Sequence, residues 1–267
     1  YAGLPSMPKT GKEIFSSDFT VTVGGFAITA IGLARLGGSV KLLTKIGDDP
    51  LGNLINNQLK DEGVKTNSVI VEEDTLTNNT TALVYQGDRS FVTYQETDLA
   101  VGDLVHNQFK ENKLKLKNID HLHMLLEGNL ENNSLLNKLN KDSITTSLVA
   151  NWEGVEVFKD DLTALNKVLA NIDFFFCNEL EAKLLSGQES VEKALNQLKQ
   201  KTCPIITLGA KGAITVNNNQ KIIRSEAIEV DFLDPTGAGD SLAAGFISGL
   251  NQNWSRQKCL DLGVICG

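Results

Sequence analysis

Runs typical of β-strands alternate with helical patterns along most of this chain, from about residue 23 onward. The predicted strands cover 40–44, 119–125, 144–149, 172–177, 204–208 and 227–233, and the predicted helices cover 25–36, 50–62, 131–140, 160–170, 179–185, 190–200 and 239–250. Strands that alternate with helices form a parallel sheet covered by helices on both faces. We therefore expect an α/β protein with a mainly parallel central sheet.

A hairpin interrupts this alternation. Residues 80–85 and 90–94 are rich in β-branched and aromatic residues, and Gly87–Asp88 supplies a turn between them. This pattern is typical of an antiparallel hairpin, which we interpret as a flap added to the α/β core. Residues 213–224 are predicted to form a second hairpin.

The composition limits the class of protein. With 267 residues, 41% of them hydrophobic, the chain can bury a full core as one large domain or as one domain with an appendage. The net charge of −8 and the lack of any run of five basic residues argue against nucleic-acid binding. No apolar stretch in the sequence is long enough for a membrane span, and no signal-peptide pattern is seen.

The four cysteines, at positions 177, 203, 259 and 266, are scattered along the chain. Without a Cys-x-x-Cys motif, they predict buried free thiols in a reducing cytoplasm rather than a zinc site. Both chain ends are expected to be incomplete. Tyr1 opens in a loop with no preceding strand, and the apolar segment 260–267 stops within a helical pattern.

A glycine-rich turn, Asp-Pro-Thr-Gly-Ala-Gly-Asp at 234–240, lies between a predicted strand and a predicted helix. Glycines let backbone N–H groups approach an anion, and the first turn of a helix leaves its N–H groups unpaired. The helix dipole adds partial positive charge at the same place. Asp240 puts a carboxylate beside this predicted anion site. A base that takes a proton from an attacking hydroxyl would have to lie at this position.

Two other interpretations compete with the anion site. In one, the glycines make a tight turn and Asp240 caps the helix. In the other, Gly237 and Gly239 open a dinucleotide-binding fingerprint. That fingerprint needs a third glycine where the chain has Leu242, and a βαβ unit of roughly 30 residues for which the remaining sequence is too short.

Polar clusters also follow the predicted strands 172–177 and 204–208, and ligands of α/β sheets bind beyond the carboxyl ends of strands. Asn178 and Glu181 share one helical turn, so an amide oxygen and a carboxylate could hold Mg²⁺ directly or through water. Alternatively, these two residues form a capping box at the start of a helix. The second cluster is Thr207 to Gly212.

The chain resembles the ribokinase-like, or PfkB-type, family of carbohydrate kinases over nearly its whole length. The turn at 234–240 is similar to the family's C-terminal signature, and Asn178-x-x-Glu181 is similar to its N-x-x-E motif. The remaining matches are to the N-terminal glycine signature and the nucleotide-site loop, at Gly24-Gly25, Gly32–Gly37, Ile46–Gly52 and Thr207–Gly212.

The resemblance implies a three-layer αβα sandwich with a small β lid, as a single domain over 1–267 with lid segments around 1–22 and 68–96. It also implies a phosphotransferase that moves the γ-phosphate of ATP to a hydroxymethyl group of a sugar or related alcohol. Asp240 would be the catalytic base, and the backbone N–H groups of Gly237, Ala238 and Gly239 would form the anion hole. Phosphoryl transfer needs positioning and charge neutralisation more than covalent chemistry, which agrees with such a site.

The resemblance further implies the binding residues. The nucleotide and its Mg²⁺ would be held by Asn178, Glu181, Thr207, Gly209 and Gly212. A monovalent cation such as K⁺ would be bound near Asp234 and Thr236, and the sugar near Gly24, Gly25, Thr29 and Asn151. Thr29 stands where the family signature usually has an asparagine that contacts sugar hydroxyls, and Val149 stands where many relatives have an aspartate.

These two departures support an alternative function, a catalytically inactive protein of the same fold that binds a sugar or nucleotide. The retained Asp240 argues against it, because an inactive kinase has no need of the base. The expected partners are ATP and a small sugar, without nucleic acid or membrane. The exposed face of a lid hairpin could also pair with a second copy to form a homodimer.

Overall fold

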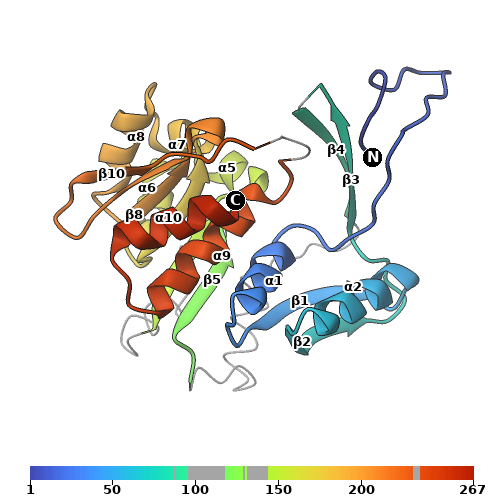
Figure 1. Cartoon of the computed structure of the whole chain (residues 1–267), viewed down its shortest axis with the longest axis horizontal. Coiled ribbons are helices and arrows are strands. Elements are labelled where there is room, and N and C mark those ends of the chain that lie inside the picture. The colour runs from blue at the N-terminus through green and yellow to red at the C-terminus, as the bar shows by residue number, and fades with distance from the viewer. Residues whose placement is uncertain (87, 96–117, 129, 131–143, 231–234) are drawn as a thin grey trace. The chain divides into compact units, whose positions relative to one another are not determined.

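The computed structural model describes residues 1–267 apart from 87, 96–117, 129, 131–143 and 231–234 (Figure 1). The chain divides into two compact units. Unit 1 comprises Tyr1–Leu99 and Glu229–Asp240, and unit 2 comprises Ala100–Ile228 and Ser241–Gly267. The chain thus leaves unit 1, forms most of unit 2, and crosses between the units again at residues 228–229 and 240–241.

Unit 2 is built on a six-stranded sheet with the strand order β10-β9-β8-β7-β6-β5. The strands are β5 (His121–Leu125), β6 (Thr145–Val149), β7 (Phe174–Asn178), β8 (Cys203–Thr207), β9 (Ala213–Val216) and β10 (Ile222–Ser225). Strands β5 to β8 pair in parallel, and β9 and β10 continue the sheet as an antiparallel hairpin. The predicted α/β class with a mainly parallel sheet is confirmed, as is the hairpin at 213–224.

Helices cover both faces of this sheet. Figure 1 shows α9 and α10 over one face and α6 to α8 over the other, which gives unit 2 its three layers. The helices are α5 (Trp152–Phe158), α6 (Leu162–Leu169), α7 (Glu179–Ser186), α8 (Val191–Leu198), α9 (Ala238–Asn251) and α10 (Arg256–Cys266), with a short 3₁₀ turn η2 (Gly209–Lys211). Sequence patterns predicted α6 to α9 at nearly these bounds but missed the short helix α5.

The core of unit 2 forms where these layers meet. Phe174 and Phe176 of β7 lie two residues apart, so both face the same side, and each packs edge-on against Phe246 of α9 with ring centroids 5.5 Å apart. Phe175 points to the opposite face and is fully buried. A strand buried on both faces reads as a continuous apolar run, which is why the Phe-Phe-Phe sequence predicted this strand.

Unit 1 contains a smaller α/β arrangement. Its elements are α1 (Ala27–Arg35), β1 (Lys41–Gly47), α2 (Pro50–Asp61), β2 (Lys65–Glu72), β3 (Asn79–Tyr85) and β4 (Asp88–Tyr94). β1 and β2 pair in parallel, and Leu42 and Leu59 pack in a cluster with Val23, Ala30 and Val64. Pro50 at the first position of α2 and the Asp49 carboxylate, which accepts from the Gly52 N–H at 2.7 Å, fix the start of that helix.

β3 and β4 form the predicted antiparallel hairpin, with Asn79 opposite Tyr94. The first residue of the chain lies beside it, because the amino group of Tyr1 donates to the Ala82 carbonyl at 2.9 Å and the Val84 N–H donates to the Tyr1 carbonyl at 3.0 Å. Residues 68–72, which are part of a predicted lid segment, lie in β2 and pair with β1. The single domain with lid segments stays a prediction.

The predicted strand at 227–233 is wrong over the part that the structure describes. Residues 227–230 lie in no strand, and Ile228 and Val230 are 60% and 71% exposed. Apolar residues alternate there, but no described strand pairs with the segment, and an unpaired stretch does not form a strand. Residues 231–233 and the whole of the predicted helix 131–140 lie outside the described residues.

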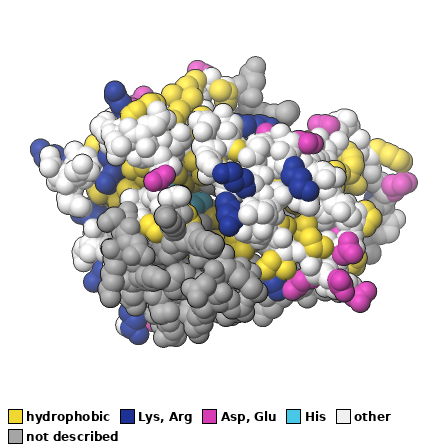
Figure 2. Space-filling view, turned by 90° about the horizontal axis from the view of Figure 1, so that it is seen from below, with side chains coloured by type: hydrophobic (Ala, Val, Ile, Leu, Met, Phe, Trp, Pro, Cys, Tyr) yellow, Lys and Arg dark blue, Asp and Glu magenta, His cyan; other side chains and the backbone are white. Residues whose placement is uncertain are grey.

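On the face seen in Figure 2, Lys and Arg side chains of the coloured residues lie at several separate places. All four cysteines are free thiols, as predicted, but only Cys177 and Cys259 are buried, whereas Cys203 and Cys266 are partly exposed. Among the described residues, no helix combines the length and apolar character that a membrane span requires.

Two largely buried histidines lie on β5. His121 Nδ1 is 2.8 Å from Thr145 Oγ1, and its Nε2 is 2.7 Å from Ser147 Oγ. His123 Nδ1 lies 2.6 Å from the same hydroxyl of Ser147. Burial lowers the pKa of His121 to about 4, and burial together with repulsion from His121 lowers the pKa of His123 to about 3.

We expect acid to destabilise unit 2 through these histidines. The unfolded chain takes up both protons near pH 6.5, and the folded chain resists until pH 4 and below, so their contribution is complete above pH 6.5 and is lost as the pH falls. The slope is up to about 1.4 kcal/mol per pH unit for each histidine. Urea unfolding, followed through Trp152 and Trp254 of unit 2, measures it. A double variant, His121→Gln and His123→Gln, should flatten the profile, and an equally steep one would contradict this origin.

Candidate active site

The last three residues of the glycine-rich turn, 238–240, are the first three residues of α9. Gly237 has a φ of +83°, a left-handed conformation that glycine adopts without strain. A β-carbon at Gly237 would also lie 2.7 Å from Ile28 Cδ1 of α1. Gly237 therefore allows the turn both to reverse direction and to approach α1. Gly239 has no such requirement, since its φ is not positive and nothing lies within 4 Å of a β-carbon placed there.

The three predicted anion-hole amides differ in whether they form a backbone hydrogen bond in this structure. The Ala238 N–H donates to the Pro235 carbonyl at 3.1 Å, which closes the turn. Within the part of the chain that the structure describes, the N–H groups of Gly237 and Gly239 make no backbone hydrogen bond. Gly237 directly precedes α9 and Gly239 is its second residue, and the dipole of this 14-residue helix adds partial positive charge at this end. These two amides thus keep the capacity to bind an anion.

Asp240 is the third residue of α9 and is largely buried. The Thr29 hydroxyl of α1 lies 3.3 Å from Asp240 Oδ1 and 3.2 Å from the Asp240 carbonyl oxygen. Burial raises the pKa of Asp240 to about 6, against the weaker opposite effects of the Thr29 hydroxyl and a backbone N–H. A carboxylate with this pKa is ionised at neutral pH and still basic enough to accept a proton.

The other predicted residues of unit 1 are placed as follows. Gly24 and Gly25 are exposed and directly precede α1, and the Gly25 carbonyl accepts from the Ile28 N–H at 3.0 Å. Thr29, which was predicted to lie near the sugar, is 2% exposed. Thr236 is exposed, and Asp234 lies outside the described residues.

The sheet of unit 2 brings the remaining predicted residues to one edge. Asn151, Asn178 and Thr207 lie at or just beyond the carboxyl ends of β6, β7 and β8, which are neighbouring parallel strands. Asn178 and Thr207 are direct partners in the β7–β8 register. The Ala150 N–H, next to Asn151, donates to the Phe176 carbonyl of β7 at 2.8 Å. This edge is where ligands of parallel α/β sheets bind.

Asn178 and Glu181 form the capping box that we considered as an alternative. The Asn178 side chain accepts from the Glu181 N–H at 2.9 Å, and Glu181 Oε2 accepts from the Asn178 N–H at 2.8 Å. Burial raises the pKa of Glu181, opposed by that backbone hydrogen bond. Among the described residues, no group of three His, Cys, Asp or Glu side chains could hold a metal by itself.

The loop after β8 has a defined shape. The Leu208 N–H donates to the Gly212 carbonyl at 2.8 Å, and the Gly212 N–H donates to the Gly209 carbonyl at 2.9 Å, which closes the turn η2. Gly209 and Gly212 have φ values of +58° and +83°. A β-carbon at Gly212 would collide with the carbonyl oxygen of Ser225, whereas nothing lies within 4 Å of one at Gly209.

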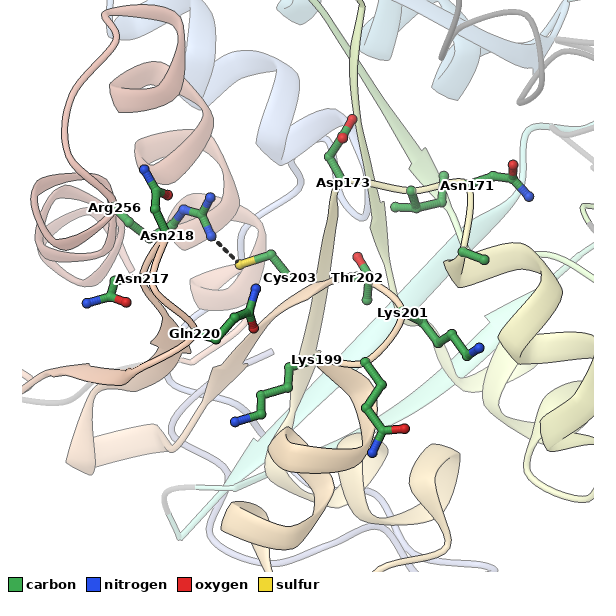
Figure 3. Close-up of a pocket in the computed structure, with 13 residues that line it drawn as sticks. Asn171, Asp173, Lys199, Lys201, Thr202, Cys203, Asn217, Asn218, Gln220 and Arg256 are labelled. Carbon is green, nitrogen blue, oxygen red and sulfur yellow. Dashed lines mark hydrogen bonds between the residues drawn. The ribbon is translucent and has the colours of Figure 1, made fainter.

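The pocket in Figure 3 is a different place in unit 2. It lies beside the amino ends of β7 and β8, with a volume of about 530 Å³, and none of the predicted site residues line it. Arg256 is held there by structural contacts, because its Nη1 donates to Cys203 Sγ at 2.7 Å and to the Val216 carbonyl at 3.1 Å, and its guanidinium lies 5.1 Å from the centre of the Phe174 ring.

Known proteins share this fold. A crystal structure from Escherichia coli, described as a ribokinase II in complex with ATP and Mg²⁺, superimposes with a TM-score of 0.76 at 23% identity, covering 97% of this chain and 86% of that one. The fold is thus the ribokinase-like fold that the sequence predicted. Residues 10–267 match the pfkB family of carbohydrate kinases, and the chain belongs to that family.

Two curated relatives are similar along nearly the whole chain. The ribokinase of Haemophilus influenzae is 25% identical over 274 residues, covering 97% of this chain and 84% of the relative. The 2-dehydro-3-deoxygluconokinase of Bacillus subtilis is 27% identical over 285 residues, covering 100% of this chain and 83% of the relative. The family is one of phosphotransferases, so the prediction of a carbohydrate kinase is confirmed at that level.

We expect the two glycines of the loop after β8 to differ in their tolerance of a methyl group. Gly209→Ala should cost about 1 kcal/mol of unfolding free energy, because only the positive φ opposes it. Gly212→Ala should cost clearly more, because the loop must also move away from Ser225. Both residues are in unit 2, so urea unfolding followed by tryptophan fluorescence compares them directly. Equal losses would show that the contact with Ser225 does not constrain the loop.

Proposed function

We propose that this chain transfers the γ-phosphoryl group of ATP to a hydroxymethyl group of a sugar or related alcohol. The observation that carries the proposal is Asp240, a largely buried carboxylate with a pKa of about 6 in the first turn of α9. A buried charge is costly to the folded state, and a helix start that carries only a structural cap would use an exposed residue. A catalytic base works best with a pKa near the operating pH, and burial raises the pKa of Asp240 towards that value.

In the proposed reaction, Asp240 accepts the proton of the substrate hydroxyl while that oxygen attacks the γ-phosphorus and ADP leaves. The amides of Gly237 and Gly239, with the dipole of α9, stabilise the negative charge that develops on the transferring phosphoryl oxygens. The Ala238 N–H joins them only if its bond to the Pro235 carbonyl opens or is shared. Donors that are fixed before the reaction act without reorganisation, which is the main source of catalysis in phosphoryl transfer.

The nucleotide is assigned to the carboxyl edge of the sheet in unit 2. Thr207, Gly209 and Gly212 would line it, because this loop is short, closed by its own hydrogen bonds and rich in glycine. Asn178 and Glu181 would hold Mg²⁺ through water, since the carboxylate and amide oxygens of a capping box are the kind of ligand that Mg²⁺ prefers. Bound Mg²⁺ would neutralise charge on the phosphates.

Gly24, Gly25 and Asn151 are the proposed sugar-binding residues. Gly24 and Gly25 are exposed and offer backbone groups ahead of α1. Asn151 already accepts from the Gly154 N–H at 3.0 Å as the cap of α5, so its NH₂ group is the part offered to a hydroxyl. K⁺ near Asp234 and Thr236, a homodimer through the β3–β4 hairpin and a cytoplasmic location stay predictions.

An assay of ADP release over a panel of pentoses, hexoses, keto-deoxy acids and nucleosides tests the proposal. We expect one class to be turned over with Mg²⁺ and K⁺ present, at a rate at least a hundredfold above the ATPase rate without acceptor. Omitting K⁺ then decides whether a monovalent cation activates. Binding of ATP and a sugar without turnover of any acceptor would instead support the inactive alternative.

Asp240→Asn should abolish turnover while ATP binding survives. The amide keeps the shape and cannot accept the proton, so we expect kcat to fall by about 10³-fold or more, with an ATP dissociation constant within about threefold of the wild type. In the wild type, kcat/KM should rise with pH through about 6, as Asp240 loses its proton. Asp161→Asn, an exposed cap of α6, is the matched control and should change neither value.

The same variant has an opposite effect on stability. Since folding raises the pKa of Asp240 from 3.8 to about 6, its ionised form opposes folding, and this cost grows between these two pH values, is complete above pH 6 and is absent below pH 3.8. Asp240→Asn should therefore raise the melting temperature at pH 7.5, raise it less at pH 4.5, and not raise it at pH 3. Loss of ATP binding together with a lower melting temperature would show that Asp240 is a structural residue.

A further inference from the structure

Two consecutive residues of α1 contact the first turn of α9 and the glycine that precedes it. Ile28 lies against Gly237, so closely that a β-carbon at this glycine would be 2.7 Å from Ile28 Cδ1. Thr29 reaches Asp240, three residues further along. The segment from Gly237 to Asp240, the second half of the glycine-rich turn, is therefore held by the same turn of one helix. All four residues belong to unit 1, so this arrangement is internal to one compact unit.

The Thr29 side chain is buried and its hydroxyl forms a hydrogen bond within the protein. It is 2% exposed, which leaves almost none of it available to a sugar. Its hydroxyl has one proton, which lies within reach of Asp240 Oδ1 at 3.3 Å and of the Asp240 carbonyl oxygen at 3.2 Å. Valine has the same shape without the hydroxyl, so a threonine in a buried position indicates that the hydrogen bond is used.

We propose that Thr29 is a positioning residue for the catalytic base, and that its hydroxyl holds Oδ1 of Asp240 so that Oδ2 faces the substrate hydroxyl. This inference rests on the proposed function of Asp240. Among the described side chains, Thr29 is the one that donates to this carboxylate. A carboxylate held at one oxygen keeps one rotamer, and misplacing a reacting group by about 1 Å costs as much as 10²-fold in rate.

The hydrogen bond also favours the ionised form of Asp240. Burial drives its pKa upward, and the Thr29 hydroxyl opposes that effect. Removing the hydroxyl should thus leave the base more often protonated at neutral pH. A side chain that only fills space between α1 and α9 would not alter the titration of Asp240, which gives the proposal a readout of its own.

The test compares Thr29→Val, which removes the hydroxyl, with Thr29→Ser, which keeps it. In protein with ¹³C-labelled aspartate, the carboxyl signal of Asp240 is assigned by its loss in Asp240→Asn and titrated by NMR. We expect Thr29→Val to raise the apparent pKa of Asp240 by about one unit, and Thr29→Ser to return it close to the wild-type value. The matched control is Thr146→Val in unit 2, which removes the hydroxyl of a buried threonine that also donates to an aspartate, since Thr146 Oγ1 donates to Asp173 Oδ2 at 2.9 Å. It should leave the Asp240 titration unchanged.

Kinetics with ATP and the sugar of the panel that the wild type phosphorylates fastest give the second readout. Thr29→Val should lower kcat about tenfold or more, with both KM values within about twofold, move the acid limb of kcat/KM to higher pH, and be rescued by Thr29→Ser. An unchanged Asp240 titration would overturn the proposal, as would a raised sugar KM at constant kcat, which would make Thr29 a sugar contact. If the wild type phosphorylates nothing in the panel, the proposed function fails, and the titration still decides whether Thr29 holds the carboxylate.

Discussion

Parallel pairing of β5 to β8 in chain order is the constraint on which unit 2 depends. Because parallel strands all point the same way, each one ends at the same edge of the sheet, and whatever residue follows it is delivered there. Asn178 and Thr207 are partners in one register although 29 positions separate them in the sequence. The apolar strands supply the stability of the layer, and the polar residues that follow them supply its chemistry. The residues that stabilise the fold therefore lie within each strand, and the residues proposed to bind ligands lie at or just beyond its carboxyl end.

At the start of α9, in contrast, the residues proposed to act in catalysis also affect the stability of the fold. Helix dipoles and unpaired amides favour an anion there, and Asp240 brings a carboxylate into that place. Burial makes its ionised form costly, as its raised pKa shows. The Thr29 hydroxyl offsets part of that cost without removing it. A fully satisfied carboxylate would be more stable but a poorer base, because each hydrogen bond to the ionised form lowers its affinity for a proton.

Local signals made most of the fold predictable. The Phe-Phe-Phe run at 174–176 and the Asn178-x-x-Glu181 cap mark a strand end and a helix start within a few residues, so neighbouring positions alone sufficed. The predicted strand at 227–233 is wrong over 227–230, because alternation shows which residues could face a core but not whether another strand is there to pair with them. The role of Thr29 could not be predicted, since its partner lies 211 positions away and no local pattern marks a buried threonine.

The capping box illustrates how a structural and a functional interpretation can hold together. Glu181 uses Oε2 to accept from the Asn178 N–H, and Asn178 uses Oδ1 to accept from the Glu181 N–H. A carboxylate has two oxygens and each oxygen has two lone pairs, so these bonds fix both side chains without exhausting their capacity to bind water. A water-mediated Mg²⁺ site benefits from ligands that are already immobilised, because less rotamer entropy is lost on binding. The cap that ends β7 and begins α7 therefore supports the proposed metal site rather than excluding it.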